Sequence, residues 1–303
     1  MLSRYHRDMS EARSRIVLGG SSLEKLNDSA LEKFLILAFG LGIREIDSAP
    51  TYGNLEDSLG RILGDDSDWK VNSKIGNRSH LDFPVEGIAQ QVENSLTLLK
   101  RNRLETVFVH SVPLNKLNET IKLSIVSLKL DKLTNFVGFS SNSNIEDLQA
   151  AVDMPMFDKF QVTCNILDQS NLSAIYEKME REIYFKRIFG SGVLRTDFLD
   201  DVKLQTKILL GLKGRFDVND YHYRFKRMFG IAPSKSKFHQ VFFEYVLSLG
   251  REKRLIVGTT DPRHLRDLVQ LERQANSLKP DQLVHFSSRF KELESKYGWT
   301  PYR

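Results

Sequence analysis

The sequence predicts a closed (β/α)8 barrel, an α/β fold in which eight parallel strands alternate with helices. Two observations lead to this prediction. Eight short apolar runs alternate with segments of helical periodicity, and the length of 303 residues accommodates a fold that needs about 250. A doubly wound open sheet is the competing arrangement. It is the weaker one because no G-x-G-x-x-G motif follows any predicted strand.

The predicted strands are short and apolar, and most of them finish on polar side chains. They cover residues 15–20, 44–49, 70–76, 105–112, 135–141, 159–165, 183–189 and 254–260. In a parallel barrel the carboxyl ends of all strands meet at one mouth, where catalytic residues gather. The polar strand ends are therefore the first place to look for chemistry.

The segments between the strands repeat apolar residues at helical spacing. We expect Asp28 to cap the first helix, and Asn54 the second, with Asp57 in the position of a capping box. A third, longer face follows Asp82 and Pro84. Helices are expected over about 31–38, 55–63, 85–99, 117–133, 144–152, 171–182, 237–250 and 262–274, with a C-terminal helix over about 281–296.

One domain over residues 1–303, with a barrel core at about 15–275, is predicted because no linker or composition break divides the chain. The connection after the seventh strand, residues 195–237, is too long for an ordinary loop, and we expect it to hold a helix of its own. It is basic and aromatic. This favours either a cover over an anionic substrate or cofactor, or a solvated surface helix.

Composition excludes several classes of protein. An apolar content of 41% and a net charge of +5 exclude intrinsic disorder. The chain has no block of five or more Lys or Arg residues, which argues against nucleic-acid binding. The lone cysteine, Cys164, excludes an internal disulfide and a multi-cysteine metal site. The longest apolar stretch, Phe34 to Ile43, is too short for a membrane helix, and the first residues lack a secretory pattern. We expect a cytoplasmic protein without a membrane partner.

Four polar residues fall on successive strand ends and the loop beside them. Asp47, Lys74 and His110 end the second, third and fourth strands, and Tyr52 follows Asp47 by five residues. Each alone has an ordinary structural explanation, such as a turn aspartate or a core histidine. Together they suit proton transfer. A tyrosine is a weak acid near neutral pH unless an ammonium stabilises its phenolate, and an aspartate keeps that ammonium charged.

The segment Gly42 to Glu56 resembles the signature G-x-x-x-I/F-D-T-A-x-x-Y-G-x-x-E of the aldo-keto reductases. Further similarities follow in order, in segments 71–74, 95–100, 107–110, 137–140, 160–165, 190–194 and 256–262. The resemblance implies an NADP(H)-dependent barrel enzyme that reduces an aldehyde or ketone without a metal. It also implies a catalytic tetrad of Asp47, Tyr52, Lys74 and His110, in which Tyr52 is the acid and His110 orients the carbonyl.

The same resemblance implies a set of cofactor-binding residues. Ser140, Ser141 and Gln161 match positions that hold the nicotinamide carboxamide. Lys186 falls where many members place a tyrosine or an arginine against the nicotinamide ring, with Arg187 as the alternative after a shift of one residue. The match also includes Gly192 and Leu194, which complete this part of the set.

The adenosine phosphate of the cofactor is expected after the eighth strand. Asp261 and Pro262 open a helix there, and a helix N-terminus attracts anions. The candidate residues of this second part of the set are Gly258, Thr259, Thr260, Arg263, His264 and Arg266. Because relatives commonly carry a basic residue in place of Gly258 and an arginine in place of His264, we expect a modest preference for NADPH and leave NADH open.

Two other functions compete with a carbonyl reductase. One is a catalytically weak, NADPH-binding sensor or regulatory subunit on the same fold, which the unusual Lys186 favours and the intact tetrad opposes. The other is a metal hydrolase built on Asp47 and His110, which lacks any His-x-His pair. The carbonyl substrate, the physiological direction and the oligomeric state do not follow from the sequence.

Overall fold

The computed structural model describes residues 13–76, 87–141, 144–175, 181–189, 224, 227–228, 238–250, 253–274 and 278–298. Eight parallel strands pair in chain order, and β8 pairs with β1, so the barrel is closed. They are β1 (Ile16–Gly19), β2 (Glu45–Asp47), β3 (Lys70–Ile75), β4 (Leu104–His110), β5 (Thr134–Ser140), β6 (Lys159–Thr163), β7 (Glu182–Lys186) and β8 (Arg254–Val257). Each of these strands lies inside a predicted range or begins one residue before it. The predicted barrel is confirmed.

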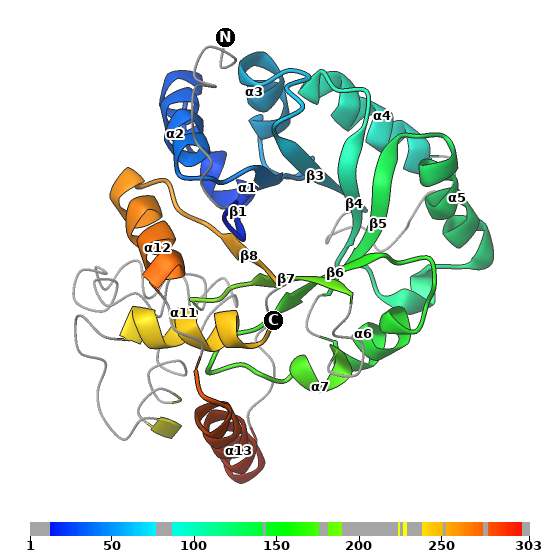
Figure 1. Ribbon diagram of the computed structural model, residues 1–303. Coiled ribbons are helices and arrows are strands. Elements are labelled where there is room, and N and C mark those ends of the chain that lie inside the picture. The colour runs from blue at the N-terminus through cyan, green and yellow to red at the C-terminus, as the bar shows by residue number, and fades with distance from the viewer. Residues whose placement is uncertain are drawn as a thin grey trace, which may run out of the picture.

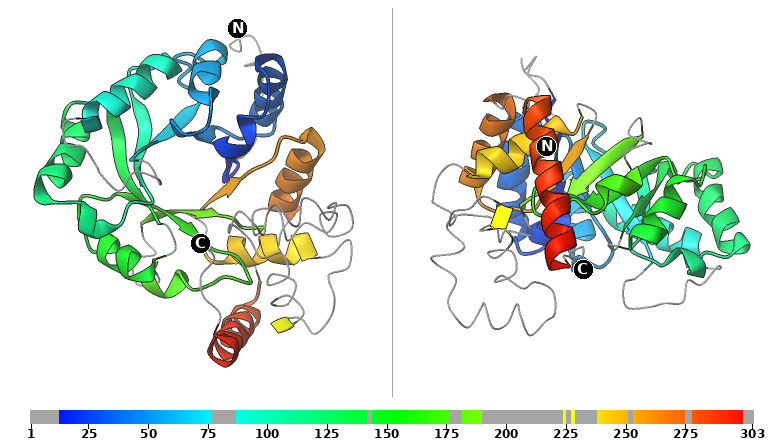
Figure 2. Two further views of the ribbon diagram at one scale, coloured as in Figure 1. Left: turned by 180° about the vertical axis from the view of Figure 1, so that it is seen from behind. Right: turned by 90° about the horizontal axis from the view of Figure 1, so that it is seen from below.

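Helices surround the strands on the outside of the barrel (Figure 1). They are α1 (Gly20–Leu23), α2 (Asp28–Gly40), α3 (Leu55–Ile62), α4 (Ile88–Leu99), α5 (Glu119–Leu130), α6 (Ile145–Val152), α7 (Leu172–Ile175), α11 (Phe238–Ser248), α12 (Pro262–Gln274) and α13 (Pro280–Tyr297), with a 3-10 turn η3 (Leu114–Lys116). The last helix, α13, lies outside this layer, as two further views show (Figure 2). It packs on α11 through the rings of Phe286 and Tyr245, whose centroids are 6.3 Å apart.

Two predicted helix caps are wrong. The side chain that caps α2 belongs to Asn27, which accepts from the backbone N–H of Ala30, whereas Asp28 accepts from Ser58 and Arg61 on α3. Asn54 precedes α3 but makes no capping bond, because its φ of −95° and ψ of 16° lie outside the extended conformation that a capping side chain needs. The predicted residues Asp82 and Pro84 lie outside the described part of the chain.

Side chains fill the middle of the barrel. Val17, Phe108 and Tyr184, from β1, β4 and β7, form a buried inner cluster that is separate from the larger core between strands and helices. Gly138 on β5 makes room for this cluster, because a Cβ there would lie 2.3 Å from the Phe108 ring. The barrel is therefore closed by packing at mid-height, and polar groups occupy its two ends.

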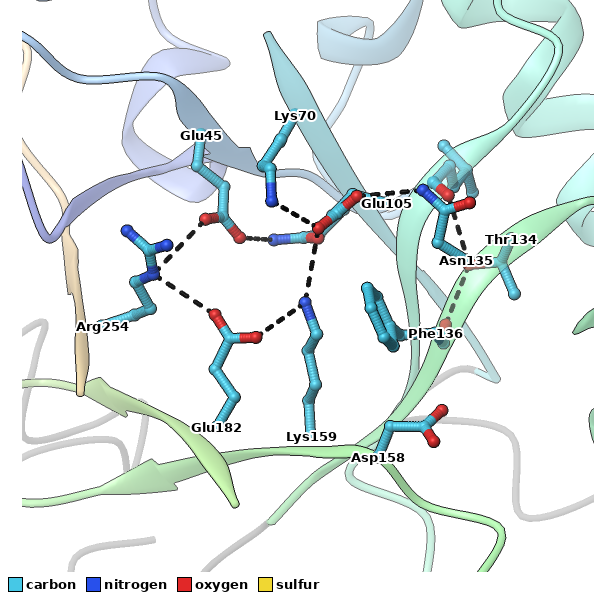
Figure 3. A network of polar contacts seen from close by, with 12 residues as sticks. Glu45, Lys70, Glu105, Thr134, Asn135, Phe136, Asp158, Lys159, Glu182 and Arg254 are labelled. Carbon is cyan, nitrogen blue, oxygen red and sulfur yellow. Dashed lines mark hydrogen bonds and ion pairs between the residues drawn. The ribbon is translucent and has the colours of Figure 1, made fainter. Parts of the chain in front are cut away.

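The amino ends of the strands carry a ring of charges that we call the floor ring, and sequence reasoning missed it (Figure 3). Its members are Glu45, Lys70, Glu105, Lys159, Glu182 and Arg254. Five pairs of opposite charge, each 2.7–3.9 Å apart, connect these six residues in order, from Lys70 through Glu105, Lys159, Glu182 and Arg254 to Glu45. The sequence did carry a signal of this ring. Each of these charges stands at or next to the first residue of its strand, and their signs alternate along the chain.

The floor ring is tied to the inner cluster through Tyr184. Its hydroxyl donates to Glu45 at 2.7 Å, and burial, together with the charge of Glu45, raises its pKa well above the ordinary value. Arg254 pairs with both Glu45 and Glu182, and their charges outweigh burial and raise the pKa of its guanidinium. This end of the barrel is therefore occupied by mutually compensated charges, and chemistry is left to the other end.

Candidate active site

Asp47, Lys74 and Tyr52 meet at the carboxyl end of the barrel. Asp47 ends β2 and Lys74 lies near the end of the adjacent β3, with both side chains on the inner face. Lys74 Nζ lies 2.8 Å from Asp47 Oδ2, 2.8 Å from the carbonyl oxygen of Ser48, and 3.3 Å from the hydroxyl of Tyr52. The three groups that the sequence predicted to act together therefore form one hydrogen-bonded chain.

Lys74 remains charged in this buried position. Its side chain is only 2% exposed, and burial by itself opposes the ammonium form. The negative charge of Asp47 and the contact with Tyr52 outweigh that penalty, and the pKa of Lys74 lies above its ordinary value. The site thus holds a permanent ammonium against a phenol oxygen.

Tyr52 lies in the turn between β2 and α3, where the chain packs tightly. Its backbone N–H donates to Ala49 and its carbonyl accepts from Leu55, which closes the turn. Gly20 at the start of α1 allows this approach, because a Cβ there would lie 2.7 Å from the Asp47 carbonyl oxygen and 3.0 Å from the Tyr52 ring. Sequence reasoning missed Gly20, since its role depends on a contact distant in sequence.

His110 completes the predicted tetrad from the end of β4. It is 9% exposed, and its ring meets that of Tyr52 edge-on at 6.5 Å between centroids. Its register partner on β5 is Ser140. The imidazole therefore lies beside the Tyr52 ring at the same mouth.

Glu56 connects the segment that carries Tyr52 to the strand that carries Lys74. It lies in the first turn of α3, and its Oε1 accepts from the hydroxyl of Ser73, the residue before Lys74, at 2.5 Å. Burial raises the pKa of Glu56, although the hydrogen bonds of Ser73 and Ser95 oppose that rise. The contact thus joins α3 to β3 at the residue next to Lys74.

Gln161 contacts the tetrad itself. Its Nε2 lies 2.5 Å from Oδ1 of Asp47, although the two residues are 114 positions apart. Sequence reasoning placed Gln161 with the cofactor-binding residues and did not foresee this bond. Both carboxylate oxygens of Asp47 thus have a donor, Lys74 on one and Gln161 on the other.

Ser140, Ser141 and Lys186 form a second polar group at the mouth. Lys186 ends β7, and its Nζ lies 3.0 Å from Ser140 Oγ and 2.7 Å from the carbonyl oxygen of Ser141. Both serines are buried at the end of β5. The neighbouring Arg187 has a left-handed φ of 57°, and its carbonyl accepts from Asn165. The structure therefore brings Lys186 onto the serines.

The region after β8, where the adenosine phosphate is expected, contains a carboxylate at the start of its helix. Asp261 and Pro262 open α12 as predicted, but Asp261 Oδ1 itself accepts from the backbone N–H of Arg263 at the helix start. The Arg263 guanidinium pairs with the same carboxylate at 2.8 Å, and His264 Nε2 lies 3.8 Å from it. The hydrogen bonds from Arg263 hold the pKa of Asp261 far below its ordinary value. Arg263 and His264, two of the predicted phosphate ligands, thus lie against a carboxylate of the chain.

The remaining predicted cofactor-binding residues lie after β8, on α12 or outside the described part of the chain. Gly258 packs against Ser22 of α1, because a Cβ there would lie 2.6 Å from the Ser22 hydroxyl oxygen. Thr259 Oγ1 accepts from the backbone of Asp261, Thr260 is half-buried beside it, and Arg266 is exposed on α12. Gly192 and Leu194 lie outside the described residues. Of segment 195–237, the structure describes only Arg224, Arg227 and Met228.

Two structural features of other protein classes do not occur within the described ranges. No group of three or more His, Cys, Asp or Glu side chains there could hold a metal ion. No helix among the described residues is long and apolar enough to cross a bilayer.

Solved structures of aldo-keto reductases share this barrel. A protein from Pseudomonas aeruginosa, itself provisionally assigned to that group, is 26% identical, with a TM-score of 0.66 over 88% of this chain and 92% of its own. The holo form of an enzyme from Bacillus halodurans is 17% identical, with a TM-score of 0.71 over 91% and 92%. An enzyme from Klebsiella pneumoniae in complex with NADPH is 13% identical, with a TM-score of 0.61 over 92% of both chains.

Sequence comparison relates most of the chain to the same group of proteins. No curated protein matches at a significant level. The family model described as the aldo/keto reductase family matches residues 15–284, which include every described residue of the tetrad and of the two polar groups at the mouth. The chain belongs to the aldo/keto reductase family.

Proposed function

We propose that this protein reduces an aldehyde or ketone to an alcohol with NADPH, with Tyr52 as the general acid. The observation that carries the proposal is the chain from Asp47 through Lys74 to Tyr52, with 2.8 Å and 3.3 Å between its successive atoms. A buried ammonium against a phenol oxygen is what proton donation from a tyrosine requires, because it stabilises the phenolate that remains.

The donors at the mouth fit a nicotinamide carboxamide. Ser140 accepts a hydrogen bond from Lys186, so its own hydroxyl hydrogen is directed to another acceptor. Ser141 is buried beside it. NADPH supplies a hydride when it is bound, and the matched relative from Klebsiella pneumoniae was solved with that cofactor.

The chain's own residues perform the proton transfer. In the proposed reaction His110, whose ring contacts the Tyr52 ring, donates a hydrogen bond to the substrate oxygen. Bound NADPH would supply the hydride to the carbonyl carbon, the C=O π pair would move to oxygen, and the Tyr52 hydroxyl would give that oxygen its proton. Lys74 holds the resulting phenolate, and a proton from solvent restores it. A carbonyl is thereby reduced to an alcohol and the cofactor is oxidised.

The proposal is tested by the absorbance of the reduced nicotinamide in the presence of aldehydes, ketones, sugars and sugar phosphates. Steady turnover of any of them is expected, and Tyr52→Phe should lower its rate by at least about 10²-fold while leaving NADPH affinity unchanged. Retention of more than half of the rate by Tyr52→Phe would refute the role of Tyr52. NADPH binding without turnover of any carbonyl would instead favour the sensor alternative.

A further inference from the structure

Glu56 is a buried acidic residue that the proposed proton transfer does not use. It lies in the first turn of α3, four residues after Tyr52, and is only 3% exposed. A glutamate is rarely buried to this degree unless it has a partner. The backbone N–H of Leu55 donates to the carbonyl oxygen of Tyr52 at 3.1 Å, so a short hydrogen-bonded turn joins Tyr52 to Glu56. A displacement of Glu56 therefore moves Tyr52 with it.

Ser73 is the partner that holds Glu56. It precedes Lys74 on β3, and because alternate residues of a strand face opposite sides, Ser73 faces α3 while Lys74 faces the barrel interior. The Ser73 hydroxyl donates to Glu56 Oε1 at 2.5 Å, which is short for a bond between two oxygen atoms. A neutral carboxyl and a carboxylate both present an oxygen that can accept this bond. The contact is therefore available in either protonation state of Glu56.

Two hydrogen bonds close a path between the segments that carry Tyr52 and Lys74. On the outer side of the barrel wall, 2.5 Å separates Glu56 from Ser73, and on the inner side 3.3 Å separates Lys74 Nζ from the Tyr52 hydroxyl. The rest of the path is covalent, through residues 52–56 and through the peptide bond between Ser73 and Lys74. Because both covalent parts are short, the outer bond restricts how far the inner pair can separate.

The surroundings of the outer bond resist displacement. Helix α3 lies directly against α4, because a Cβ on Gly60 would overlap the backbone of α4. Ser95 of α4 places its Oγ 3.5 Å from the Oγ of Ser73. Burial raises the pKa of Glu56, and the hydrogen bonds of Ser73 and Ser95 and the charge of Lys74 oppose that rise. Glu56 therefore interacts with Lys74 through its charge as well as through the chain.

We propose that Glu56 is a positioning residue for the proton transfer, which fixes through Ser73 the separation between the Lys74 ammonium and the Tyr52 hydroxyl. This inference rests on the proposed function, because it assigns Glu56 to the step in which Tyr52 gives up its proton. Glu56 acts through Ser73, from the outer side of β3. Without the outer bond the turn and the strand move apart, and the ammonium stabilises the phenolate less.

The size of the effect follows from geometry and from Coulomb's law. A displacement of about 1 Å in a catalytic arrangement can lower a rate by about 10²-fold. The same displacement from 3.3 Å, at an effective dielectric constant of about 20, shifts the ionisation of a group beside an ammonium by about 0.8 pH unit. A purely structural contribution of Glu56 would lower the stability of the protein but leave the rate and the pH profile of the folded enzyme unchanged.

The test is the Glu56→Ala variant, assayed with NADPH and a carbonyl substrate that the wild-type protein reduces. Its kcat should fall about ten- to hundred-fold, whereas the dissociation constant of NADPH should stay unchanged. The alkaline limb of the kcat–pH profile should move up by about 0.8 pH unit, because Tyr52 keeps its proton to higher pH when the ammonium is farther away. Glu56→Gln retains an oxygen that accepts from Ser73 and should recover most of the rate.

Ser73→Ala removes the other half of the same bond and carries the test if Glu56→Ala does not fold. It should lower kcat by a similar factor and shift the pH profile in the same direction. The double variant should lose no more activity than either single variant, because the two substitutions break one contact.

Asp57→Ala is the matched control. Asp57 follows Glu56 in the first turn of α3, its side chain is 44% exposed, and it pairs with Arg61 of the same helix. The substitution removes an acidic side chain from the same helix end but leaves the bond between Glu56 and Ser73 in place. Neither kcat nor the pH profile should change.

Three results would overturn this inference and leave the proposed function standing. They are a wild-type kcat in Glu56→Ala and Ser73→Ala, a lowered kcat with an unshifted pH profile, and an equal loss in Asp57→Ala. Absence of carbonyl turnover by the wild-type protein would overturn the proposed function and this inference together.

Discussion

The side-chain amide of Gln161 donates to Oδ1 of Asp47 at 2.5 Å, across the barrel interior from β6 to β2. Lys74 occupies the other carboxylate oxygen at 2.8 Å. A buried carboxylate is stable only when its oxygens are paired with donors. Gln161 therefore supports the same group that keeps Lys74 charged, and hydrogen bonds connect Gln161, Asp47, Lys74 and Tyr52 in one network.

Gln161→Glu should destabilise the protein at neutral pH, because it places a second carboxylate against Asp47. Two adjacent carboxyl groups cannot both ionise, and the free energy of unfolding is expected to fall by about 3–5 kcal/mol at pH 7. The loss should shrink as pH falls below about 5, where one carboxyl takes a proton. Chemical denaturation at several pH values measures both effects.

Gln161→Leu provides the uncharged control for that experiment. It removes the hydrogen bond to Asp47 but adds no charge, so it should cost about 1–3 kcal/mol. Similar pH dependence in the two variants would contradict a charge conflict at Asp47.

Asp261→Asn should strengthen NADPH binding by about two- to five-fold and leave NADH binding unchanged, if the adenosine phosphate lies at the start of α12. Asparagine preserves the cap at the helix start, removes the negative charge and releases Arg263 from its ion pair. Titration with each cofactor measures the effect. Asp281→Asn, at the exposed start of α13, is the control and should alter neither affinity. Equal tightening of NADH would locate the phosphate elsewhere.

Glu182→Gln should weaken the floor ring in a pH-dependent way. Burial alone would raise the pKa of Glu182, but Lys159 and Arg254 outweigh it and hold that pKa below its ordinary value. The charged form therefore contributes stability above the unfolded-state pKa of about 4.5, and this contribution is lost as pH falls through the lower folded-state value.

The expected cost of Glu182→Gln is about 1–2 kcal/mol in the free energy of unfolding at pH 7, with a smaller difference from wild type at pH 3. Glu292→Gln removes the exposed partner of Arg289 and should change stability by less than about 0.5 kcal/mol at either pH. A cost for Glu182→Gln that is constant with pH would argue against the role of its charge.

Glu56→Gln should show the opposite pH trend. Burial raises the folded-state pKa of Glu56, so the protonated carboxyl is favoured by folding. The resulting stability is fully present below about pH 4.5 and is lost as pH rises through the folded-state value. Relative to wild type, Glu56→Gln should therefore gain stability as pH rises from 4 to 8. A relative loss over that interval would contradict the raised pKa.

The sequence determined the barrel and predicted four residues, Asp47, Tyr52, Lys74 and His110, that the fold brings to one mouth. Strands and helices follow from apolar periodicity, which is a local property, and the eight predicted strands agree with the structure for that reason. These residues could be predicted because parallel strands bring their carboxyl ends to one mouth of the barrel. Residues at strand ends, such as Asp47, Lys74 and His110, therefore converge wherever the barrel forms.

The tertiary structure decided which partners these residues have. The choice of Asn27 over Asp28 as the cap of α2 depends on Ser58 and Arg61, which lie in another helix and engage Asp28. The bond from Gln161 to Asp47 and the reach of Lys186 to Ser140 depend on strand stagger and on which strands face each other across the barrel. Such contacts join positions distant in sequence, and periodicity carries no information about them.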